Sequence, residues 1–90
     1  MAYGDAYNYL HIPTATTTTV KTGTGVLHSI TVGAKGLGAY VVYDNTAGSG
    51  TKIADNLGST VETTDVYDVA FTTGLTIVTA GASKLTVTYR

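Results

Sequence analysis

The chain has 90 residues, a formal net charge of −1 and no cysteine. A chain of this length forms one domain near the lower limit of independent folding, and without Cys neither disulfides nor thiolate metal sites can stabilise it. The five basic residues are spread along the chain, whereas a nucleic-acid surface needs them clustered. No apolar run approaches the ~20 residues that span a bilayer, and the N-terminus lacks the basic start and apolar core of a secretory signal. We therefore expect no nucleic-acid or membrane partner, and stabilisation by other copies or by a larger assembly.

The composition predicts an all-β protein. Thr is the most frequent residue, Gly occurs 11 times, Gln is absent and Glu62 is the only Glu. β-branched residues suit a pleated surface better than a helix, and frequent Gly marks turns. We expect a small antiparallel β-sandwich, with jelly-roll connections as one form of it.

Residues 1–13 differ from the rest, because aromatic side chains occupy odd positions and aliphatic ones even positions. An extended backbone directs alternate side chains to opposite faces, and Pro13 ends the segment. Two interpretations fit: an arm that reaches a neighbouring protein, or an ordinary first strand packed on its own domain. We divide the chain into an extended arm, 1–13, and a β-sandwich, 14–90. The candidate interface residues of the arm are Tyr3, Tyr7, Tyr9, Leu10, His11 and Ile12.

Residues 14–90 contain short β-like segments separated by Gly-rich turns at the spacing of a sandwich or barrel. Between them, 55–64 is polar and weakly patterned, which is typical of a loop or an edge. We expect about seven short strands. They span 16–21, 26–32, 39–44, 52–54, 66–71, 75–78 and 85–89.

The two histidines are the first candidates for chemistry. His28 alternates in phase with Val26 and Ile30, so we expect it on the apolar face of its strand as a satisfied core or edge residue. His11 is better explained as an interface contact in the arm. Neither has the H-x-H, H-x-x-x-H or HExxH spacing of a transition-metal site.

The carboxylates and hydroxyls do not assemble into a catalytic set either. Asp65 and Asp68 fall on opposite faces of an extended strand, which is poor geometry for a shared metal or a glycosidase pair. Asp44-Asn45 lacks the alternating ligands of a calcium loop and is typical of a turn. No serine lies in a G-x-S-x-G elbow, and the short Gly motifs are not followed by a helix that could bind phosphate. We predict no enzymatic activity, no catalytic residue, no cofactor and no metal.

Four strings resemble small Thr/Gly-rich virion proteins of tailed bacteriophages. In such proteins a leucine-histidine-serine strand, a Y-D-N-T loop, an F-x-T-G-L corner and a terminal T-V-x-Y-R recur in this order. Here the likeness covers most of residues 14–90 and leaves out 1–13. It is carried by TTTTVKTGTGVLHSITV, VYDNTAGSGTKIA, YDVAFTTGLTIVTAG and LTVTYR.

The resemblance implies a structural component of the particle. We expect a capsid decoration or cement protein that stabilises the outer surface of the phage head. Its partners would be the major capsid protein and copies of itself, in an oligomer such as a trimer. The alternatives are a carbohydrate- or receptor-binding module, and a tail, neck or head-fibre component.

Overall fold

The computed structural model describes residues 6–33, 39–56, 63–80 and 84–90, and in these it contains eight strands and no helix. The strands are β1 (Asn8–Ile12), β2 (Thr17–Thr22), β3 (Gly25–Val32), β4 (Tyr40–Tyr43), β5 (Lys52–Asn56), β6 (Thr63–Phe71), β7 (Gly74–Thr79) and β8 (Leu85–Tyr89).

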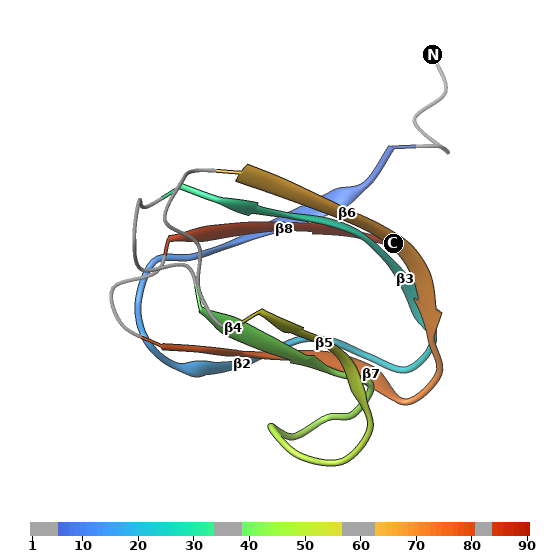
Figure 1. Ribbon diagram of the computed structural model, residues 1–90. Helices are drawn as coiled ribbons and strands as arrows, with labels where there is room; N and C mark the ends of the chain where they lie inside the picture. Colours follow the sequence, from blue (N-terminus) through green and yellow to red (C-terminus); the bar gives the residue numbers. More distant parts are fainter. Residues whose placement is uncertain (1–5, 34–38, 57–62, 81–83) are drawn as a thin grey trace.

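The strands form two antiparallel four-stranded sheets that pack face to face (Figure 1). Sheet A has the order β1-β8-β3-β6 and sheet B the order β2-β7-β4-β5. Eight strands in two sheets of this order form a jelly roll. The predicted all-β antiparallel sandwich is confirmed, with eight strands in place of seven.

The additional strand comes from the expected arm. Asn8–Ile12 pairs with β8 along its whole length, from Asn8 opposite Tyr89 to Ile12 opposite Leu85. Ile12 is only 2% exposed and belongs to the core. Burying the aliphatic side of this alternating segment removes apolar surface from water, which a reaching arm would leave exposed. For these residues the ordinary first strand is therefore correct and the arm is wrong, while Met1–Asp5 lies outside the described residues.

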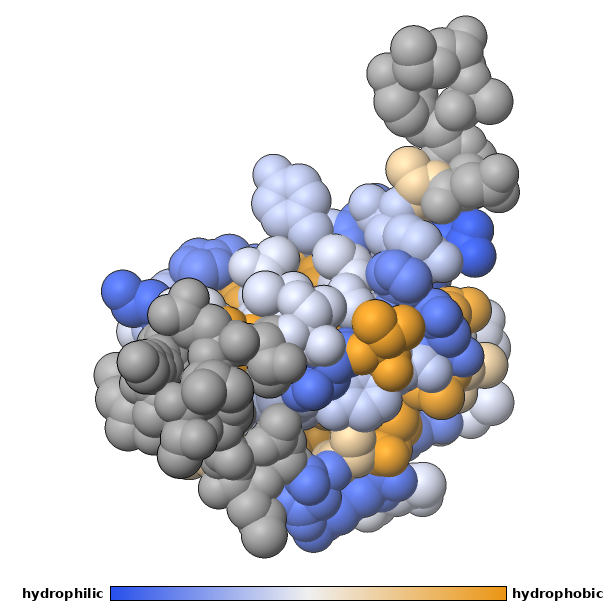
Figure 2. All heavy atoms as spheres, turned by 45° about the horizontal axis from the view of Figure 1, so that its top comes forward, coloured by the Kyte–Doolittle hydropathy of each residue, from blue (hydrophilic) through white to orange (hydrophobic). Residues whose placement is uncertain are grey.

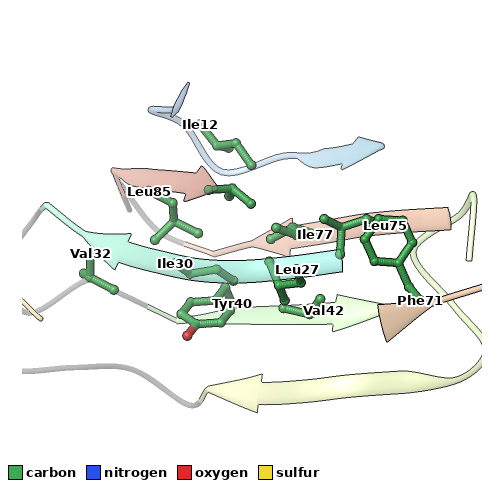
Figure 3. Close-up of a cluster of buried hydrophobic side chains, with 11 residues drawn as sticks. Ile12, Leu27, Ile30, Val32, Tyr40, Val42, Phe71, Leu75, Ile77 and Leu85 are labelled. Atoms are coloured by element: carbon green, nitrogen blue, oxygen red, sulfur yellow. The ribbon is translucent and has the colours of Figure 1, made fainter. Parts of the chain in front are cut away.

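The core lies between the two sheets and is built from alternate residues of the central strands (Figure 3). Leu27 and Ile30 of sheet A and Val42 and Ile77 of sheet B are fully buried there. The other buried apolar side chains are Ile12, Val32, Tyr40, Phe71, Leu75, Leu85 and Val87.

A bulge in β3 changes which side chains reach this core. The register with both β6 and β8 shifts between Leu27 and Ser29. Leu27 and Ile30 therefore both face inward although they are three positions apart, an odd spacing that would place them on opposite faces of a regular strand. Val26 and His28 are only half-buried. The expectation that His28 shares the apolar face was wrong, because strict alternation fails where one strand carries an extra residue.

The polar segment around residue 60 was predicted to be loop or edge. Its two ends belong to strands, since β5 extends to Asn56 and β6 begins at Thr63. Both are edge strands of their sheets. Residues 57–62 lie outside the described part of the chain.

At one edge of the sandwich a polar network joins the sheets. The Tyr40 hydroxyl on β4 donates to Asp65 Oδ2 on β6 at 2.5 Å and lies 2.6 Å from the Tyr67 hydroxyl. Burial raises the pKa of Tyr67, against the opposing effect of its hydrogen bond to Tyr40. Asp65 therefore accepts the hydrogen bond of the buried Tyr40 phenol, a role for which an inward-facing carboxylate at an edge is suited.

Candidate functional site

The loop between β4 and β5 covers the centre of the outer face of sheet B, while Thr17 and Thr19 of β2 on that face are exposed. This loop, residues 44–51, lies on the side of sheet B away from sheet A (Figure 1). Thr76 of β7 donates to the Asn45 carbonyl at 2.8 Å, and Thr19 of β2 donates to the Thr46 carbonyl at 3.2 Å. Thr76 is fully buried as a result.

The same loop approaches the sheet too closely for a larger residue. A Cβ on Gly48 would lie 2.9 Å from Val78 Cγ2 and 3.1 Å from Thr17 Cγ2. Both distances are shorter than ordinary van der Waals contact, so a glycine is required for this approach. The small-residue composition of the loop thus allows it to pack on the sheet.

Asp44 holds the loop in place at its beginning. Its carboxylate accepts hydrogen bonds from the backbone N–H groups of Thr72 at 3.0 Å and Thr73 at 2.8 Å, and from the Thr72 hydroxyl at 3.2 Å. The N–H groups of Thr73 and Thr72 hold the pKa of the Asp44 carboxyl below its ordinary value. The Asp44-Asn45 segment is therefore part of a turn that also fixes the neighbouring β6–β7 turn.

A row of side chains crosses all four strands on the outer face of sheet A, with exposed residues at its two ends and Ser29, only 6% exposed, near its middle. The strand registers place Tyr9 opposite Thr88, Thr88 opposite Ser29, and Ser29 opposite Val66. Tyr9 is 75% exposed and Val66 is 64% exposed, and they are the exposed large hydrophobic side chains of the described residues. Between them the Ser29 and Thr88 hydroxyls are 2.6 Å apart. The row is therefore apolar at its two ends and uncharged and polar in the middle.

A second row of hydroxyl-bearing side chains lies beside the first. His11 is opposite Thr86, Thr86 opposite Thr31, and Thr31 opposite Thr64. The Thr31 and Thr64 hydroxyls are 3.1 Å apart. Figure 2 shows this side of the molecule, where pale, weakly polar residues lie between orange apolar ones. Short Thr and Ser side chains have little rotamer freedom to lose when another surface covers them.

An aromatic and charged cluster lies beside the Tyr9–Val66 row, on the side away from the second row. The Tyr7 ring stacks on the His28 ring, with centroids 4.0 Å apart and planes 7° from parallel. The Arg90 guanidinium lies over the Tyr7 ring, 4.6 Å from its centroid. His28 Nδ1 contacts the Asp68 carboxylate. Tyr7 is thus fixed against the sheet by residues of β3 and by the end of the chain after β8.

Asp68 holds an unusual backbone conformation in this cluster. Its φ is +50°, in the left-handed region, and it is the one residue other than glycine found there in the described chain. Asp tolerates this region better than most residues. It lies where β6 bulges opposite the bulge of β3, and such bulges blunt an edge strand against pairing with other chains.

The structure divides the six candidate interface residues between two sides of β1. Tyr7, Tyr9 and His11 lie on the outer face of sheet A, together with residues from three other strands. Leu10 packs against the core and Ile12 is part of it, so neither is available to a partner. Tyr3 lies outside the described residues.

Sequence reasoning missed the rest of this face. Val66 and Ser29 were placed on strands without a functional role, because which strands are neighbours cannot be read from local pattern. The signal that was present is the alternation in β8, where Thr86 and Thr88 point away from the buried Leu85 and Val87.

One ion pair between described residues lies on this face. His28 contacts Asp68, and the neighbouring Ser29 hydroxyl is bonded to Thr88. Within the described ranges, no three His, Asp or Glu side chains lie where they could share a metal ion. The described residues also contain no helix that is long and apolar enough to cross a membrane. The arrangement offers surface for contact.

Comparison of the chain with models of known protein families, with curated proteins and with solved structures finds no match.

Proposed function

We propose that this protein is a non-enzymatic structural component of a tailed-bacteriophage particle, a decoration protein on the outside of the head, and that the outer face of sheet A is its assembly surface. Its partners in this proposal are the major capsid protein and copies of itself. The observation that carries the proposal is the difference between the two outer faces. The centre of one is covered by the chain's own loop, which leaves Thr76 fully buried, and the other exposes Tyr9 and Val66 at the two ends of a row whose middle carries hydroxyls.

The character of this surface supports assembly. Stable protein contacts combine aromatic and aliphatic anchors with uncharged polar groups, and they are depleted in charge at their centre. Tyr offers a large contact area with a hydroxyl at its tip. The Tyr9–Val66 row has this composition, and its centre carries no charged side chain.

A decoration protein acts by repetition. Each copy covers a junction between shell subunits with a modest area, and many copies together stabilise the shell. A domain of 9.3 kDa suits that role. The assignment to a phage particle rests on the resemblance of residues 14–90, and the jelly roll agrees with it because viral capsid domains use this fold.

The test is the copy number of the protein in purified particles of the phage that encodes it, measured by quantitative mass spectrometry against the major capsid protein. We expect hundreds of copies per particle, and fewer when Val66 is replaced by Lys. A copy number of a dozen or fewer contradicts head decoration and favours the tail, neck or head fibres. Absence from the particle contradicts the proposal as a whole.

A second function has one observation in its favour. The exposed Tyr9 ring, flanked by Thr88 and His11, is the kind of surface on which a sugar ring stacks, and lectin domains also use jelly rolls. A glycan array probed with the protein and with Tyr9→Ala tests it. Binding that requires Tyr9 would favour a carbohydrate- or receptor-binding module.

A further inference from the structure

The Tyr9–Val66 row on sheet A has the same order of side-chain types from either of its ends. From β1 to β6 it runs apolar, hydroxyl, hydroxyl, apolar, through Tyr9, Thr88, Ser29 and Val66. A two-fold axis reverses the order of strands across an interface, and a surface that is complementary to its own reversed order can pair with a second copy. We propose that the outer face of sheet A binds the same face of a second copy of this chain, about a two-fold axis parallel to the strands. This inference rests on the proposed role of that face in assembly.

The registers determine which side chains meet in such a pair. Rotation about an axis parallel to the strands keeps each row at its own height and exchanges β1 with β6. Tyr9 of one copy then faces Val66 of the other, and Thr88 faces Ser29. The second row behaves in the same way, since Thr86 faces Thr31. Apolar groups therefore meet at the two ends of the first row, where Tyr9 and Val66 are exposed, and the hydroxyls of Thr86 and Thr31, which can both donate and accept, meet in the second row.

The charged groups also suit this arrangement. Arg90 follows Thr88 by two residues and Asp68 follows Val66 by two, and β8 and β6 run in the same direction because both are antiparallel to β3. The two charges therefore lie at the same end of the face. In the pair, the guanidinium of each copy faces His28 of the other and lies about one strand away from the Asp68 carboxylate that this histidine contacts, and the carboxylate is a favourable electrostatic complement to the guanidinium.

The area of the face is small compared with that of a stable dimer interface. Four strands about 4.8 Å apart and some six residues long, at about 3.3 Å each, give roughly 400 Å² per copy. The total of about 800 Å² lies below the standard size of a stable interface. We therefore expect a reversible dimer with a dissociation constant between about 10 µM and 1 mM. On a lattice, where many copies are held close together, their high effective concentration allows the same weak contact to form.

Cysteine cross-linking tests the pairing, because the chain has no Cys of its own. Tyr9→Cys and Val66→Cys are prepared separately, mixed at millimolar concentration and oxidised mildly. We expect the mixed disulfide to form at least ten times faster than either self-linked dimer. Thr24→Cys mixed with Ser49→Cys, both on exposed loops, gives the rate of random collision. Equal rates in both mixtures, or faster self-linking of Tyr9→Cys, would overturn the proposed pair.

Sedimentation equilibrium gives an independent measurement. Val66→Lys should be monomeric at concentrations at which the original chain dimerises, with an unchanged melting temperature, and Thr24→Lys should dimerise normally. A native chain that stays monomeric at 1 mM (about the weakest affinity expected) would overturn the inference. If that monomeric chain were still abundant on particle heads, the proposed function would stand without it.

Discussion

The two sheets of this jelly roll have similar inner faces and very different outer faces. Each contributes alternating apolar side chains to one core. On the outside, sheet B carries the loop 44–51, and its central Thr76 is fully buried. Sheet A carries no such cover among the described residues, and Tyr9 and Val66 are largely exposed. Thr76 beneath the loop is therefore part of the folded interior, whereas Thr17 and Thr19 on the same face of sheet B are exposed.

The difference comes from where the hydrogen bonds of the side chains go. On sheet B, Thr76 and Thr19 bond to carbonyl groups of a loop that lies far away in sequence. On sheet A, Ser29 and Thr88 bond to each other. Thr19 and Thr76 also lie 3.1 Å apart across sheet B, so the difference between the two faces is the additional bonding to the loop, beneath which Thr76 is fully buried.

The largest effect is expected from placing a charge under the loop. Thr76→Lys puts an ammonium group at a fully buried position, and we expect a loss of at least ~3 kcal/mol in the free energy of unfolding or failure to fold. Thr88→Lys, the matched change on sheet A, should cost less than ~1 kcal/mol because its side chain can reach water. Urea unfolding of both variants measures the difference. Similar losses would contradict the contrast between the two faces.

A smaller effect on the free energy of unfolding is expected from a side chain inserted between the loop and sheet B. Gly48→Val introduces a Cβ 2.9 Å from Val78 Cγ2, so we expect a loss of about 1–3 kcal/mol from overpacking. Ala47→Val, at the exposed neighbouring position, is the control and should change the stability little. Thermal unfolding reports both values. A fully stable Gly48→Val would indicate that the loop is not packed on the sheet.

The third prediction concerns the carboxylate that fixes the loop. The pKa of Asp44 is lowered in the folded protein from its ordinary value of 3.8, so its ionised form stabilises the fold above that pH. This contribution is lost as the pH falls through the lowered pKa. Asp44→Asn should therefore be less stable than the original chain at pH 7, and the gap should close below about pH 4. Urea unfolding at pH 7 and at pH 3 tests it. A gap independent of pH would show that the charge is not responsible.

The smallest effect on the free energy of unfolding is expected from a substitution on the outer face of sheet A. Tyr9→Ser removes a ring that is 75% exposed, and we expect a change within ~0.5 kcal/mol. The same substitution should weaken self-association, because it removes one of the two apolar ends of the row, and sedimentation measures this. A large loss of stability would mean that Tyr9 supports the fold of its own chain and that the two faces differ less than their exposure indicates.

The sequence by itself determined the class of fold. Alternation in β8 and the turns between segments predicted an antiparallel sandwich, because side-chain burial on a pleated strand follows a period of two. It also identified Asp44-Asn45 as a turn and Tyr7, Tyr9 and His11 as side chains that share one face. These are local properties, and short-range backbone geometry is sufficient to produce them.

Only the tertiary structure decided that 8–12 form a strand of sheet A, which groups bond to Asp44, and which residues make up the outer face of sheet A. The paired bulges near His28 and Asp68 depend on two strands that are 40 residues apart, and local alternation cannot reveal them. Likewise, Tyr9 and Val66 share a row only because β8 and β3 lie between their strands. The order of strands in a sheet is fixed by long-range pairing and by the packing of the whole core. For this reason a polar, Thr-rich sequence does not itself show which of its threonines meet water and which meet the rest of the chain.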